Sequence, residues 1–69
     1  MKRLIIYPKD IQRITGKSAS GARRELRRIK KILGRNTNQY VTFEEYAYHS
    51  GLTLPAIAYM LDLTPSALG

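Results

Sequence analysis

The side chains that could do chemistry in this chain are arginines and lysines, and they are concentrated in one segment. All twelve basic residues lie in residues 1–35, which contain only two acidic residues and so carry a formal charge of +10. Residues 36–69 contain three acidic residues and no Lys or Arg, so their charge is −3. Because so uneven a distribution costs self-repulsion in a small domain, we expect the partner to be a polyanion.

Residues typical of catalytic and metal sites are scarce. The chain has no Cys, which excludes disulfides and thiolate metal sites, and His49 is its one imidazole. It also has no Gly-rich phosphate-binding loop. We therefore expect a protein that is not an enzyme and that uses no cofactor and no metal, with His49 at the surface or at a helix end.

The basic residues recur at the spacing of one helix face. Ser18 is a candidate N-cap and Gly34 a candidate terminator, which predicts a helix from Ala19 to Leu33. At about 100° per residue, its apolar residues gather on one face, and its cations spread over roughly 80° to 240° on the opposite face. The apolar face is formed by Ala22, Leu26, Ile29 and Leu33.

Few acidic residues are placed to neutralise this face. Six cations occupy the nine positions from Arg23 to Lys31, where the one acid is Glu25, with Arg28 as its partner three residues on. A solvated helix face is the alternative interpretation, and the excess of unpaired charge favours nucleic-acid binding.

A short helix precedes the basic one. Pro8 suits a first helical position, and Gly16 favours a helix end. A short helix, a turn at Gly and a second helix form a helix-turn-helix reader, whose second helix enters the major groove of DNA. We predict base contacts from Ser20, Arg23, Arg24 and Arg27. We predict phosphate contacts from Lys17, Arg28, Lys30, Lys31 and Arg35.

The second half of the chain repeats the first at an offset of 35 residues. The aligned pairs include Asp10 with Glu45, Thr15 with Ser50, Gly16 with Gly51, Ser18 with Thr53 and Leu26 with Leu61. A chance similarity between two helix hairpins is the alternative. Thr42 and Glu45 form a capping box, which predicts a helix over residues 43–50, and Thr53 caps a further helix that runs to about Asp62.

The last helix differs from its basic counterpart. It has no cation and is apolar on nearly all sides, which indicates burial and contact with a partner or a second copy of the chain. The predicted partner residues are Leu54, Ile57, Tyr59 and Leu61. Base stacking on RNA is one role for the tyrosines, and the commoner one is a half-buried ring with its hydroxyl in water. These tyrosines are Tyr40, Tyr46, Tyr48 and Tyr59.

These elements predict a single, mainly α domain over residues 1–69, with about four helices. Leu4–Ile6 and Tyr40–Val41 are candidates for a short two-stranded β ribbon. Residues 1–35 form the basic half, residues 36–69 the scaffolding half, and residues 64–69 a frayed tail. With no long apolar run and no signal-peptide pattern, we expect a cytoplasmic, nucleoid-associated protein without membrane contact.

From Tyr7 to Leu52 the chain resembles short bacterial helix-turn-helix proteins akin to excisionase and MerR-type DNA-binding domains, which are associated with mobile elements. The matching residues are Asp10-Ile11, Thr15-Gly16-Lys17-Ser18, Ala22-Arg23-Arg24, Leu26, Ile29-Lys30, Leu33-Gly34, Val41-Thr42, Glu45-Tyr46 and Gly51-Leu52. The resemblance implies duplex DNA binding by residues 17–28 and a role in recombination or transcription. Those families carry a wing hairpin after the second helix, and here only residues 35–41 are available for one.

The expected function is therefore duplex DNA binding without catalysis. Two alternatives stay open from the sequence. An RNA or ribosome binder would use the same basic face together with the tyrosines. A protein-interaction module would bind its partner through residues 54–61, and the basic half would only steer association.

Overall fold

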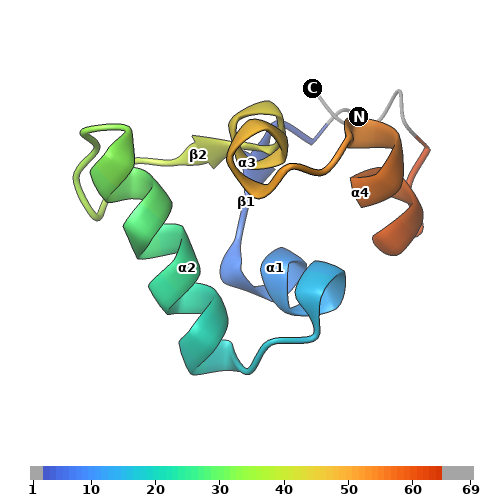
Figure 1. Cartoon of the computed structure of the whole chain (residues 1–69), viewed down its shortest axis with the longest axis horizontal. Helices are drawn as coiled ribbons and strands as arrows, with labels where there is room; N and C mark the ends of the chain where they lie inside the picture. Colours follow the sequence, from blue (N-terminus) through green and yellow to red (C-terminus); the bar gives the residue numbers. More distant parts are fainter. Residues whose placement is uncertain (1–2, 65–69) are drawn as a thin grey trace.

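The computed structural model describes residues 3–64, in which four helices and a two-stranded sheet pack together (Figure 1). In chain order the elements are β1 (Ile5–Ile6), α1 (Pro8–Thr15), α2 (Ala19–Ile32), β2 (Val41–Thr42), α3 (Phe43–Ser50) and α4 (Leu54–Met60). This arrangement confirms the expected fold class. No helix within residues 3–64 has the length and apolar character needed to cross a membrane.

The small sheet joins the beginning of the chain to its middle. Ile5 pairs with Thr42 and Ile6 with Val41 in antiparallel register. The ribbon predicted from sequence is thus confirmed, with its second strand one residue further along than Tyr40–Val41. Because β2 pairs with β1, the segment between α2 and α3 forms no wing hairpin.

Two helix-turn-helix units follow one another with nearly the same backbone. Gly16 ends α1 at φ 76° and ψ 8°, and Gly51 ends α3 at φ 77° and ψ 9°. These are left-handed conformations that glycine adopts without a Cβ penalty. Ser18 and Thr53 then cap α2 and α4, each accepting a hydrogen bond from the amide three residues later. The turns and caps of the 35-residue repeat therefore recur in the structure, whereas α2 has 14 residues and α4 has 7.

One hydrophobic core joins the two units. The first unit contributes Ile6, Ile11, Ile14, Ala22, Leu26 and Ile29, and the second contributes Val41, Phe43, Tyr46, Ala47, Ile57, Ala58 and Leu61. Ala22, Leu26 and Ile29 are the predicted apolar face of the basic helix, and Leu33 packs against the same core while partly exposed. The apolar face of α2 is thereby fixed inward, so its cationic face points to solvent.

The last helix is shorter than the sequence predicted. It ends at Met60, two residues before Asp62, which adopts a left-handed φ of 56°. Ile57 and Leu61 are 0% and 3% exposed, so both serve the core and neither is available to a partner. Of the predicted frayed tail, residues 65–69 lie outside the described residues.

Candidate nucleic-acid interface

The basic helix α2 lies along one side of the molecule, at the left of Figure 1. It packs against α1 and β2. All of the predicted base-contact residues are exposed, namely Ser20, Arg23, Arg24 and Arg27. The helix starts at Ser18, whose hydroxyl accepts a hydrogen bond from the Gly21 amide at 3.1 Å. This cap fixes the register in which the cations face outward.

The ion pairs of the described residues divide the cations into two groups. The first group consists of arginines outside α2 that each hold a carboxylate. These pairs are Arg3 with Asp10 at 2.9 Å, Arg13 with Asp62 at 3.3 Å, and Arg35 with Glu45. Arg3 and Arg35 connect separate segments of the fold, whereas the Arg13–Asp62 pair is exposed and contributes little to stability. In all three pairs the carboxylate offsets the charge of the arginine.

The Arg3–Asp10 pair was not foreseen from the sequence. Both guanidinium nitrogens donate to the two oxygens of Asp10, at 3.1 and 2.9 Å, and the Tyr7 amide donates to the same carboxylate at 2.8 Å. Asp10 is buried, and the Arg3 guanidinium lies 5.2 Å from the centre of the Phe43 ring. The pair therefore anchors the start of α1 to the start of α3.

Arg35 has a structural role rather than the predicted phosphate contact. It forms a bidentate pair with Glu45 and also donates to the Tyr40 carbonyl at 3.3 Å. Glu45 closes the capping box of α3, where it accepts from the Thr42 amide at 3.0 Å. The hydrogen bonds from Arg35 lower the pKa of Glu45 to about 2. Partial burial opposes this shift, and the hydrogen bonds from Thr42 reinforce it. Arg35 thus ties the loop after α2 to α3.

Two lysines of the predicted phosphate set also have contacts within the protein. Lys17 Nζ lies 3.9 Å from Glu25 Oε1, and Lys30 Nζ donates to the Thr37 carbonyl at 2.7 Å. Glu25 also accepts a hydrogen bond from the buried Tyr46 hydroxyl at 3.1 Å. Burial raises the pKa of this phenol above its usual value, and the charge of Glu25 raises it further. Glu25 therefore contacts Lys17 and Tyr46, and not Arg28, which is the cation that the spacing made available to it.

The second group consists of cations on α2 that have no ion-pair or hydrogen-bond partner among the described residues. Within residues 3–64, five side chains of α2 form neither an ion pair nor a hydrogen bond, and they are Arg23, Arg24, Arg27, Arg28 and Lys31. All five are exposed. They share the outward face of one helix, so their charges add in one place and leave a strong local excess of positive charge.

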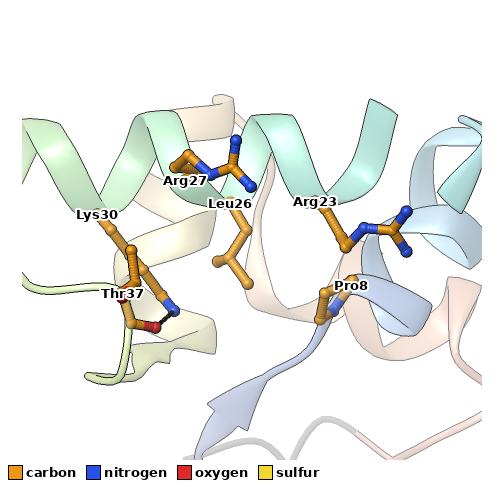
Figure 2. Close-up of a pocket in the computed structure, with 6 residues that line it drawn as sticks. All are labelled: Pro8, Arg23, Leu26, Arg27, Lys30 and Thr37. Atoms are coloured by element: carbon orange, nitrogen blue, oxygen red, sulfur yellow. Dashed lines mark hydrogen bonds between the residues drawn. The ribbon is translucent and has the colours of Figure 1, made fainter. Parts of the chain in front are cut away.

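Shallow hollows flank this cationic face on both sides. On one side, a hollow of about 200 Å³ is lined by Pro8, Arg23, Leu26, Arg27, Lys30 and Thr37 (Figure 2). On the other side, a hollow of about 200 Å³ is lined by Lys17, Gly21, Arg24, Glu25 and Arg28. The cations therefore border two grooves that run beside α2, in addition to covering its crest.

The tyrosines do not match the expectation of half-buried rings. Tyr46 is fully buried, whereas Tyr40, Tyr48 and Tyr59 are 60%, 83% and 84% exposed. Tyr40 meets the Tyr7 ring edge-on at 6.1 Å between centroids. Tyr59 lies on α4, which is at the far side of the molecule from α2 in Figure 1. Tyr59 therefore cannot extend the basic face.

The predicted partner surface is only partly accessible. Leu54 is half-buried, and Tyr59 is the one predicted partner residue with a largely exposed side chain. Leu52 and Met60 were not among the predicted partner residues, although Met60 lies in the predicted segment 54–61; they are 38% and 49% exposed. Tyr59 and Met60 are therefore neighbouring exposed side chains at the end of α4.

The surroundings of His49 fit its predicted position. It lies in the last turn of α3, half-buried, with its ring 5.2 Å from that of Tyr48. Within the described part of the chain, no three His, Cys, Asp or Glu side chains are grouped so that they could hold a metal ion.

Comparison with known protein families, curated proteins and solved structures found no match for this chain. The resemblance to excisionase and MerR-type domains stays a prediction. The functional argument therefore depends on the interface itself.

Proposed function

We propose that this protein binds duplex DNA without catalysing a reaction, and that α2 lies in the major groove. The observation that carries the proposal is the set of five exposed cations on α2 that pair with no residue in the described range 3–64. Four of the five acidic residues are already paired, with Arg3, Arg13, Lys17 and Arg35. The remaining charge is thus left to an external polyanion, and phosphates are the anions that a DNA groove offers.

The arrangement of α2 favours a groove over a flat surface. A major groove about 12 Å wide admits one helix, with its crest toward the bases and its flanks toward the two strands. On the helical wheel, Ser20, Arg27 and Arg24 lie roughly 140° to 200° from Ala22, directly opposite the core. We assign Ser20 and Arg24 to base edges, and we place Arg27 at the edge of the groove, because it also lines the hollow beside Arg23. Arg28 lies on one flank and Lys31 toward the C-terminal end, and both suit contacts to phosphates.

A role in transcription or recombination follows only from the resemblance to mobile-element proteins. The exposed Tyr59 and Met60 at the end of α4 offer a place for a protein partner or a second copy of the chain. If two copies meet there, the two α2 helices would read two half-sites of a symmetric operator.

The test is fluorescence anisotropy of a labelled random-sequence duplex, titrated with protein at about 50 and 200 mM salt. We expect binding with Kd of roughly 10⁻⁴ to 10⁻⁶ M that weakens steeply with salt. Arg24→Ala with Arg27→Ala should weaken it strongly. The matched control is Ala56→Glu with Tyr59→Glu, which changes the net charge equally on the exposed side of α4. That control should retain most of the affinity.

Two results would contradict the proposal. Tighter binding of single-stranded or structured RNA than of duplex DNA would favour the RNA or ribosome alternative, in which the exposed Tyr7–Tyr40 pair would stack on bases. Absence of binding to both nucleic acids at low salt would leave the protein-interaction alternative. Purified partners would then be sought with Tyr59→Glu as the negative control.

A further inference from the structure

The hollow beside α2 combines two kinds of surface in one place. Its lining comes from α2, from the first residue of α1 and from the loop after α2, which contributes Thr37 (Figure 2). Its volume of about 200 Å³ is several times the roughly 30 Å³ that one water occupies in the liquid. It can therefore hold a group larger than water.

The floor of the hollow is apolar and its rim is cationic. Leu26 points into it from α2, and the Pro8 ring faces it from α1 (Figure 2). Arg23 and Arg27 stand one helical turn apart on the rim and have no partner among the described residues. Lys30 is different, because its ammonium group donates to the Thr37 carbonyl at 2.7 Å. That hydrogen bond holds the loop that contains Thr37 against α2, and this loop closes the third side of the hollow, after α2 and α1.

We infer that this hollow seats one deoxyribose-phosphate unit of a DNA strand at the edge of the groove. The inference rests on the proposed function and deepens it. The phosphate would lie between the guanidinium groups of Arg23 and Arg27, whose planar donors match phosphate oxygens. The apolar face of the sugar would rest on Pro8 and Leu26.

This assignment changes the role of two predicted base contacts, Arg23 and Arg27, which both become contacts to the DNA backbone. Arg23 lies roughly 100° from Ala22 on the wheel, on the flank that borders the hollow rather than on the crest. A backbone contact from Arg23 positions the helix and carries no base information. Lys30 is a positioning residue, since it acts by holding Thr37 in the wall.

The first test is a ¹³C-methyl and ¹⁵N-amide NMR titration of the full chain with a random-sequence duplex at low salt. We expect the Leu26 methyls and the Thr37 amide to shift in a saturable way together with the outer face of α2. If α2 shifts while Leu26 and Thr37 stay unchanged, the hollow is overturned and DNA binding stands. If nothing shifts, both proposals are overturned.

A parallel titration with inorganic phosphate at matched ionic strength separates the two sources of this chemistry. Inorganic phosphate should shift Leu26 and Thr37 far less than the duplex does, because it lacks the sugar and the neighbouring phosphates. Equal shifts at equal concentration would make the hollow a site for free phosphate and would overturn its assignment to a DNA strand.

The second test is a double-mutant cycle on duplex affinity. If Arg23 and Arg27 hold one phosphate together, each single change to Ala should weaken binding about tenfold, which is the loss of one charged contact. If the two effects were independent, the double variant would bind roughly a hundredfold more weakly, which is the product of the two single losses. We expect a clearly smaller loss, because the first substitution already breaks the shared contact. The matched control pairs Arg23→Ala with Arg28→Ala on the opposite flank, where the losses should multiply. Multiplying losses for Arg23 and Arg27 as well would overturn the shared contact.

Discussion

The salt dependence of DNA binding gives a quantitative test of which cations are free. Each phosphate that a cation neutralises contributes about 0.9 to the slope of log affinity against log salt. Arg28, Lys31 and the contact that Arg23 and Arg27 share would neutralise three phosphates, which predicts a slope of about −2.7 for the wild-type protein. Between 50 and 200 mM salt, this slope amounts to a loss of affinity of about 40-fold.

A single substitution should change this slope by a known amount. Lys31→Ala removes one phosphate contact, so the slope should become about −1.8 and the loss over the same range about 12-fold. Arg13→Ala removes the same formal charge, but Arg13 is already paired with Asp62 at 3.3 Å, so the slope should not change. Fluorescence anisotropy across a salt series measures all three slopes.

Folding can be held constant in this comparison. Lys31 is exposed and makes no hydrogen bond or ion pair with another described residue, so its loss should change stability by less than about 0.5 kcal/mol. Circular dichroism melts check this. Two results would refute the division of the cations into paired and free groups. One is the same salt slope for the wild type and Lys31→Ala. The other is a salt slope that Arg13→Ala reduces as much as Lys31→Ala does.

Three further predictions concern the scaffold. The lowered pKa of Glu45 means that its ionised side chain stabilises the wild-type fold above about pH 4.5, and this stabilisation is lost as the pH falls toward 2. Glu45→Gln should remove this pH dependence. The melting temperatures of the two proteins should therefore converge only at acid pH. Gly51→Ala should lower the free energy of unfolding in urea by about 1–2 kcal/mol, because φ is 77° at this position. Nothing lies within 4 Å of an added Cβ, so the loss comes from the backbone conformation and not from a clash. A urea midpoint equal to that of the wild type would contradict this. Tyr46→Phe should cost about 1 kcal/mol in the same assay, since Glu25 loses the phenol donor but keeps Lys17; an unchanged midpoint would show that the bond contributes nothing.

The local structure could be predicted because its signals are local. Gly16 and Gly51 end helices, Ser18 and Thr53 begin them, and each effect acts within one turn of the backbone. The repeat could be predicted for the same reason, since the same signals recur 35 residues later. The outward face of α2 followed from its periodicity.

The roles of individual charges could not be predicted in the same way. Arg35 and Glu45 are ten residues apart and meet only because a loop turns the chain back onto α3. Sequence spacing suggested that Glu25 would pair with Arg28, but the fold brings the Tyr46 hydroxyl to it from 21 residues away. Which cation is left free is decided by such tertiary contacts.

The exposure of Tyr59 could have been found with the repeat alone. At the 35-residue offset it aligns with Arg24, an exposed position of the equivalent helix. Composition suggested instead that the whole of α4 was apolar and therefore buried. The repeat alignment predicts the exposure of Tyr59 better than composition does, because equivalent positions face outward whichever residues occupy them.

The shared core and the β1–β2 pairing couple the two units thermodynamically. A ligand that binds only the folded protein raises its stability by about 2.7 kcal/mol at a concentration 100 times its Kd. Because the residues of α4 share a core with those of α2, this protection should spread through the molecule. Amide hydrogen exchange should therefore slow in α4 when DNA binds α2, at a helix that the DNA never touches.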